Sequence, residues 1–151
     1  MTTVPDDSAW MTLACELARN CPVSDHAYSV GAVIVDNNGN EVARGWSRED
    51  DPHVHAEESA LSKVAPGDPR LNGATIYSTL EPCSERKSRP VACTQLIINS
   101  RIGRVVTAWR EPSLFVADCQ GIELLKQTGA EVVEMPEFAD AAMAPNRHLK
   151  L

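Results

Sequence analysis

The alternation of apolar and polar segments along the chain predicts a series of strands and helices. Apolar residues at helical spacing between Trp10 and Leu17 predict a first helix that ends near Asn20. Two β-rich runs, 29–36 and 41–46, flank an Asn- and Gly-rich turn, which is the pattern of a hairpin. The elements predicted after it are a helix over 55–64, a strand over 74–80, a helix over 90–99, a strand over 103–109, a helix over 118–128 and a strand over 131–135.

This order of elements predicts an α/β protein. Strands and helices alternate in the second half, and such crossovers are right-handed and give parallel strands. The opening hairpin adds two antiparallel strands. We therefore expect a three-layer α/β/α arrangement with a five-stranded mixed sheet. A length of 151 residues fits one domain with a proper core, so we expect residues 1–151 to form that domain.

The composition of the chain indicates which binding partners and which cellular compartment to expect. The formal net charge of −7 argues against broad binding of nucleic acid, which requires a basic face. No apolar run approaches the length that spans a bilayer, and the polar, acidic stretch from Thr2 to Asp7 does not resemble a secretory signal. Five cysteines without a disulfide-like spacing fit a reducing compartment, so we expect a cytoplasmic protein.

Four residues in two separate motifs predict a metal-dependent active site. His55 is followed two positions later by Glu57, and downstream Pro82-Cys83 is followed by Cys93. One imidazole and two thiolates suit a tetrahedral Zn²⁺ that keeps one position for water. Glu57 would serve as the proton shuttle of a deaminase rather than as a ligand.

The predicted surroundings of these residues favour the zinc interpretation over isolated surface or core residues. His55 lies at the start of a predicted helix, Cys83 follows a predicted strand, and Cys93 falls in the first turns of another helix, with Pro90 suited to its first position. His53 is the alternative ligand, but it lacks the Ala-Glu sequel. The other cysteines show no ligand spacing among themselves, and they are Cys15, for which we expect a place in the core, Cys21 and Cys119.

With these residues and this element order, the chain resembles the cytidine deaminase superfamily over nearly its whole length. Within it, the chain is most similar to the pyrimidine deaminases of riboflavin synthesis, above all the fungal type. The nine-residue gap between Cys83 and Cys93 matches that type, whereas cytidine deaminases and tRNA adenosine deaminases carry a two-residue gap. The segments that carry the resemblance are 27–35, 45–49, 55–57, 79–84 and 111–116.

The resemblance implies a cytidine deaminase-like fold and a zinc-dependent hydrolytic deaminase. Its expected substrate is a small heteroaromatic amine, the diamino-ribosylamino- or ribitylamino-pyrimidinone phosphate of riboflavin synthesis, and members of the superfamily imply a homodimer. Two departures leave other substrates open, among them dCMP, cytidine, a free base or a specialised nucleoside. His26-Ala27-Tyr28 stands where the bacterial riboflavin enzymes carry Pro-Asn-Pro, and Ser47 stands where they carry histidine.

Residues outside the zinc motifs are candidates for substrate binding. Arg86 and Arg89, with Lys87 between them, form a basic cluster in the loop between the two cysteines and could hold a phosphate. An ordinary solvated loop is the alternative. Ser47 and Arg48 end the second strand and could reach the substrate, although Ser is also a common turn residue. Glu81 precedes Pro82 and could orient the loop.

Two other functions remain open from the sequence. A tRNA adenosine deaminase is disfavoured by the acidic charge and the long cysteine gap. A structural zinc module that binds a partner without chemistry is disfavoured because structural zinc sites usually close with four protein ligands, whereas three are spaced to meet here.

Overall fold

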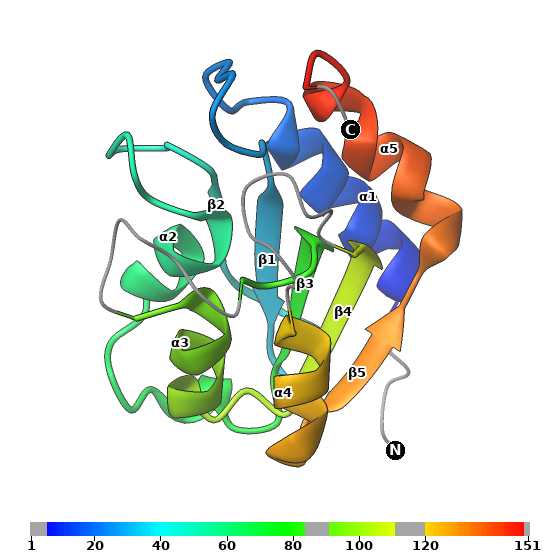
Figure 1. The fold of residues 1–151 in the computed structure, drawn as a ribbon. Coiled ribbons are helices and arrows are strands. Elements are labelled where there is room, and N and C mark those ends of the chain that lie inside the picture. The colour runs from blue at the N-terminus through cyan, green and yellow to red at the C-terminus, as the bar shows by residue number, and fades with distance from the viewer. Residues whose placement is uncertain (1–5, 84–90, 111–119, 150–151) are drawn as a thin grey trace.

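One mixed sheet forms the centre of the protein. The computed structural model describes residues 6–83, 91–110 and 120–149. The strands in these residues are β1 (Gly31–Val35), β2 (Glu41–Trp46), β3 (Thr75–Leu80), β4 (Arg104–Trp109) and β5 (Glu131–Glu134). They lie in the order β2-β1-β3-β4-β5 (Figure 1). β1 pairs antiparallel with both β2 and β3, and the pairs β3–β4 and β4–β5 are parallel, which confirms the predicted mixed sheet.

Helices cover both faces of this sheet. They are α1 (Asp7–Ala18), α2 (Ala56–Ser62), α3 (Cys93–Ser100), α4 (Gly121–Gln127) and α5 (Ala139–Met143), with short 3₁₀ turns at Pro69–Leu71, Pro136–Phe138 and Ala144–Asn146. Figure 1 shows α1 and α5 on one face and α2, α3 and α4 on the other, as expected for three layers. Within the described ranges, no helix combines the length and the apolar character needed to cross a bilayer.

The two faces of the sheet carry separate apolar cores because side chains alternate between the faces of each strand. On β1, Ala32 and Ile34 pack toward α2, α3 and α4, while Val33 and Val35 pack toward α1 and α5. Every residue of β1 and β3 is buried, as is typical of inner strands covered on both sides.

Most predicted elements are present, with small differences at their ends. The hairpin strand over 41–46 is confirmed with those bounds. The helix predicted from residue 90 begins at Cys93 instead, and Pro90 lies outside the described residues. Helix α5 and its flanking 3₁₀ turns were not predicted, because prolines interrupt an Ala-rich stretch too short for a periodic signal.

A polar network joins the start of α1 to the sheet. The Asp7 carboxylate accepts hydrogen bonds from both terminal nitrogens of the Arg104 guanidinium, at 2.8 and 2.6 Å, and from the Tyr77 hydroxyl at 2.6 Å. The guanidinium holds the pKa of Asp7 below its ordinary value of 3.8. The network is about four-fifths shielded from solvent, with side-chain exposures of 19% for Arg104 and 22% for Asp7.

We expect Asp7→Asn to lower the free energy of unfolding by about 1.5 kcal/mol at neutral pH, since it removes a charge-assisted bidentate pair. Because the folded state depresses the pKa of Asp7, this contribution is present above pH 3.8 and is lost as the pH falls below that value. Urea denaturation of both proteins should therefore show a constant difference from about pH 7 to pH 5 and a shrinking one below about pH 4. The exposed Asp25, changed to Asn, is the control. An equal loss in both variants would contradict this role.

Candidate metal centre and active site

The predicted zinc ligands lie where the end of β3 meets the first residues of α2 and α3. His55 immediately precedes α2, Cys83 follows the last residue of β3 by three positions, and Cys93 is the first residue of α3. Figure 1 shows α2 and α3 on the same face of the sheet, and the two helices contact each other. The fold thus gathers residues that are as many as 38 positions apart in the sequence.

The spacing of the three side chains fits a tetrahedral zinc ion. His55 Nδ1 lies 3.3 Å from Cys93 Sγ and 3.7 Å from Cys83 Sγ, and all three ligand atoms lie within 4.8 Å of one another. Bond lengths of about 2.3 Å to sulfur and about 2.0–2.1 Å to nitrogen give a nitrogen-to-sulfur separation of about 3.6 Å in a tetrahedron. Both nitrogen-to-sulfur separations are close to that value, so the geometry fits a zinc ion.

The environment of Cys83 favours the thiolate that a metal requires. The pKa of Cys83 is lowered to about 4, first by a hydrogen bond with the Cys93 thiol and then, against the opposing effect of burial, by the His55 imidazole. The Cys93 backbone N–H also donates to Cys83 Sγ, at 3.3 Å. Both sulfurs belong to buried residues, so solvent competes little for them.

Glu57 belongs to the same cluster. It is the second residue of α2, it is 4% exposed, and its carboxyl hydrogen-bonds with the Cys93 thiol. Burial raises the pKa of Glu57, and the negative charge of Cys83 raises it further, while the His55 imidazole opposes both. A buried carboxyl beside three metal-ligand atoms has the position that a proton shuttle requires.

Close packing of α2 on the hairpin sets the position of His55 and Glu57. A Cβ atom at Gly45 would lie 2.7 Å from Ala56 O and 2.6 Å from Ala60 N, so a side chain there would push the helix away. The His55 backbone N–H donates to the Glu58 carboxylate at 3.2 Å, which stabilises the first turn. Gly45 on β2 therefore lets α2 pack close to the sheet, and this packing sets where His55 and Glu57 lie.

Ser47 and Arg48 lie at the same edge of the sheet, but their contacts are with the protein itself. Ser47 is buried and its Oγ accepts from the Val30 N–H at 2.9 Å. The Arg48 guanidinium donates to the carbonyls of Pro22 and Tyr28, with its shortest bond 2.6 Å long. These contacts give both residues a structural role, and their contact with substrate stays a prediction.

The remaining predicted residues divide between those the structure places elsewhere and those it does not describe. His53 is exposed and is not part of the ligand group, and Cys15 is buried among core residues, as expected. Residues that lie outside the described part of the chain are Arg86, Lys87, Arg89, the segment 111–116 and Cys119.

Sequence reasoning missed two buried polar residues that hydrogen-bond to the backbone of other segments. Asn146 is buried near the end of the described chain, and its amide pairs with the backbone of Ser29, accepting from N–H at 2.6 Å and donating to the carbonyl at 3.0 Å. Thr94 was also missed, although it directly follows Cys93. A separation of 117 residues leaves no local sequence signal for the Asn146 contact.

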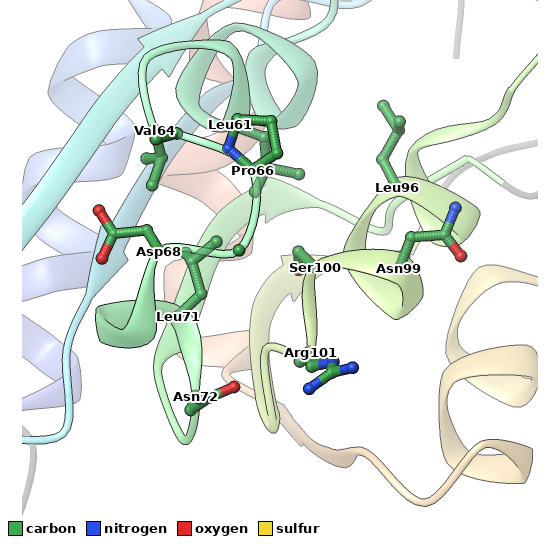
Figure 2. A pocket seen from close by; sticks show the side chains of 12 residues that line it. Leu61, Val64, Pro66, Asp68, Leu71, Asn72, Leu96, Asn99, Ser100 and Arg101 are labelled. Atoms are coloured by element: carbon green, nitrogen blue, oxygen red, sulfur yellow. The ribbon is translucent and has the colours of Figure 1, made fainter.

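A cavity among the described residues lies away from the cluster of His55, Cys83 and Cys93. Its volume is about 560 Å³, and it lies between α2, α3 and the connection that follows α2 (Figure 2). Leu61 and Val64 line it from the last turn of α2 and just beyond, Leu96 lines it from α3, and Arg101 lines it from the residue after α3. His55 and Cys93 lie at the opposite, N-terminal ends of the same two helices, so this cavity is not the space beside the proposed zinc.

A family model supplies an independent comparison for this geometry. The model of the cytidine and deoxycytidylate deaminase zinc-binding region matches residues 4–109, which contain His55, Glu57, Cys83 and Cys93. The chain belongs to this family. The three side chains that the structure gathers are therefore positioned as a metal site in a zinc-binding deaminase domain.

Relatives with curated names and solved structures agree with this membership. The diaminohydroxyphosphoribosylamino-pyrimidine deaminase of Schizosaccharomyces pombe is 44% identical over 133 residues, which are 87% of this chain and 32% of that protein. The structure of RibD from Acinetobacter baumannii is 32% identical, with a TM-score of 0.79 over 93% of this chain and 38% of that one. This deaminase-family chain thus spans about a third of the length of the S. pombe deaminase and of the RibD proteins of Aquifex aeolicus and Escherichia coli.

A third comparison supports the fold alone. The structure of Aspergillus oryzae Rib2 deaminase superposes with a TM-score of 0.76 at 24% identity, and the match covers 92% of this chain and 91% of that one. Similarity over almost the whole of both chains agrees with the three-layer arrangement and the five-stranded sheet described above.

We expect purified protein to contain about one zinc ion per chain, and His55→Ala or Cys93→Ser to remove most of it, because each deletes one of three protein ligands. Metal analysis by mass spectrometry measures this directly. His53→Ala is the matched control, since the two histidines are two positions apart and His53 lies outside the ligand group. Zinc loss in His53→Ala, with retention in His55→Ala, would contradict the assignment.

Proposed function

We propose that this chain is a zinc-dependent hydrolytic deaminase of a heteroaromatic amine. The observation that carries the proposal is the placement of buried Glu57 against a ligand group made of His55, Cys83 and Cys93. Among the residues that the structure describes, three ligands gather, which leaves one tetrahedral position for water, the arrangement of catalytic rather than structural zinc sites. The same count argues against a zinc module without chemistry.

The overall reaction replaces an amino group by a carbonyl oxygen. A carbon–oxygen bond forms to water, the carbon–nitrogen bond breaks, and ammonia leaves. Zinc bound here would supply Lewis acidity, which makes water a nucleophile near neutral pH. No electron acceptor is required, because the carbon keeps its oxidation state.

Glu57 carries the protons in this proposal. Its carboxylate accepts one from the attacking water, passes it to the ring nitrogen next to the reacting carbon, and later delivers a proton to the departing amino group. Burial keeps the carboxyl out of bulk water, and its place in the first turn of α2 fixes it relative to His55. His55, Cys83 and Cys93 hold the metal and take no part in proton transfer.

The proposed substrate is the diamino-pyrimidinone phosphate of riboflavin synthesis. The support is the 44% identity to the S. pombe deaminase and the nine residues between Cys83 and Cys93. We also propose that the 151 residues form one deaminase domain and that Arg86 and Arg89 contact the phosphate. A homodimer and a cytoplasmic location stay predictions from the sequence. A different small amine is the alternative substrate.

We expect Glu57→Gln to keep the zinc and the fold and to lower kcat by at least about 10²–10⁴-fold, because glutamine fills the same space but cannot transfer protons. Ammonia release, metal content and circular dichroism are measured on the same preparation. Glu58→Gln is the matched control, since the amide can still accept from the His55 N–H. Near-normal turnover by Glu57→Gln would rule out this mechanism.

If the substrate carries a phosphate, Arg86→Ala should raise KM for it by about 10- to 100-fold, since one charge-assisted contact is worth about 1.5–3 kcal/mol. The effect should fall on KM rather than kcat because the phosphate is remote from the reacting ring. Kinetics with a phosphorylated pyrimidine and its dephosphorylated counterpart test this, with exposed Arg19→Ala as control. A wild-type preference for the uncharged compound would point to a different substrate.

A further inference from the structure

The backbone segment 81–83, which ends in Cys83, is held in place by contacts of two residues that are not metal ligands, Glu81 and Thr94. Its backbone continues the pairing of β3 with β4, because the Glu81 N–H donates to the Trp109 carbonyl at 2.7 Å, one residue beyond the last paired residues. The Glu81 side chain turns toward α4, where its carboxylate accepts from the Ile122 N–H at 3.1 Å. Glu81 is 3% exposed, so this contact is made out of reach of solvent.

Thr94 holds the same peptide from α3. Its hydroxyl donates to the Cys83 carbonyl at 2.7 Å, with the Pro82 carbonyl also within reach at 3.3 Å. Its backbone N–H donates to the same Cys83 carbonyl at 3.1 Å. Since Thr94 directly follows Cys93, these bonds fix the backbones of the two sulfur ligands relative to each other.

Close packing completes the arrangement. A Cβ atom at Gly121 would lie 1.9 Å from the Pro82 carbonyl oxygen, so the first residue of α4 has to be glycine for the helix to approach this far. That approach is also what brings the Ile122 N–H to the Glu81 carboxylate. Buried hydrogen bonds of this kind have well-defined geometry and are costly to leave unsatisfied.

We propose that Glu81 and Thr94 are positioning residues that set the zinc affinity of the site by fixing Cys83. The proposal rests on the zinc site of the proposed function. Neither residue supplies one of the three ligand atoms. Thr94 contacts the Cys83 carbonyl, and Glu81 contacts α4, the helix that packs on Pro82. Residues that orient metal ligands in this way typically affect metal affinity by about 10- to 100-fold when changed.

The alternative is that both residues stabilise the fold and have no specific effect on the metal. The two cases differ in the dissociation constant of zinc measured on folded protein, which general loss of stability does not change. Competition with a chromophoric chelator measures that constant. The absorption bands of the Co²⁺-substituted protein report the geometry of the thiolate ligands, independently of turnover.

We expect Thr94→Val and Glu81→Ala each to raise the zinc dissociation constant by about 10- to 100-fold and to shift the Co²⁺ bands. Glu81→Gln should keep most of the affinity, because its amide oxygen can still accept from Ile122. Thr107→Val is the matched control for the loss of a buried threonine hydroxyl. Thr107 Oγ1 has no hydrogen-bond partner among the described residues, so its removal should leave zinc binding unchanged.

Several outcomes would overturn the proposal. Folded Glu81→Ala and Thr94→Val proteins that bind zinc within about twofold of wild type would show that neither residue positions a ligand. Equal losses in Glu81→Gln and Glu81→Ala would exclude the hydrogen bond as the cause. If Glu81→Ala does not fold, the comparison of Thr94→Val with Thr107→Val decides. Failure of the wild-type protein to bind zinc would instead contradict the metal site of the proposed function.

Discussion

The pairing of β3 with β4 is the constraint on which the rest of the site depends. The two strands run parallel from Thr75 opposite Arg104 to Leu80 opposite Trp109, and the Glu81 N–H extends the ladder by one more bond. Pro82 and Cys83 leave the sheet from this fixed point. Helices α2 and α3 begin at the same end of the sheet, so the positions of the strands determine where His55, Cys83 and Cys93 lie.

Charge is distributed unevenly in this acidic protein. Its net charge is −7, yet the site contains a buried carboxyl and two buried thiols beside one imidazole. The first residues of α2 and α3 meet there, and backbone N–H groups at helix starts favour negative groups. The Cys93 N–H that donates to Cys83 Sγ is an example. A dication would offset the remaining negative charge, so the metal and the burial of these groups depend on each other.

Local sequence was enough to predict much of the fold and the three side chains that the structure gathers as a possible metal site. Strand β1 is a continuous apolar run, β3 is rich in residues that favour strands, and the hairpin turn has its own Asn and Gly signal. His55 could be preferred to His53 because only it places a carboxylate two residues later at a helix start. Helix α5 escaped prediction because its five residues are held mainly by packing against α1 and the sheet.

By itself, the sequence determined the kinds of chemical group available and the order of elements, because residue type and periodicity are local properties. The tertiary structure decided which groups meet. Contacts that the motifs did not predict are those of Glu81 with Ile122, 41 positions apart, and of Asn146 with Ser29, 117 positions apart. Such contacts depend on how helices pack on the sheet, including the close approach that Gly45 permits, and the spacing of residues along a chain does not encode them.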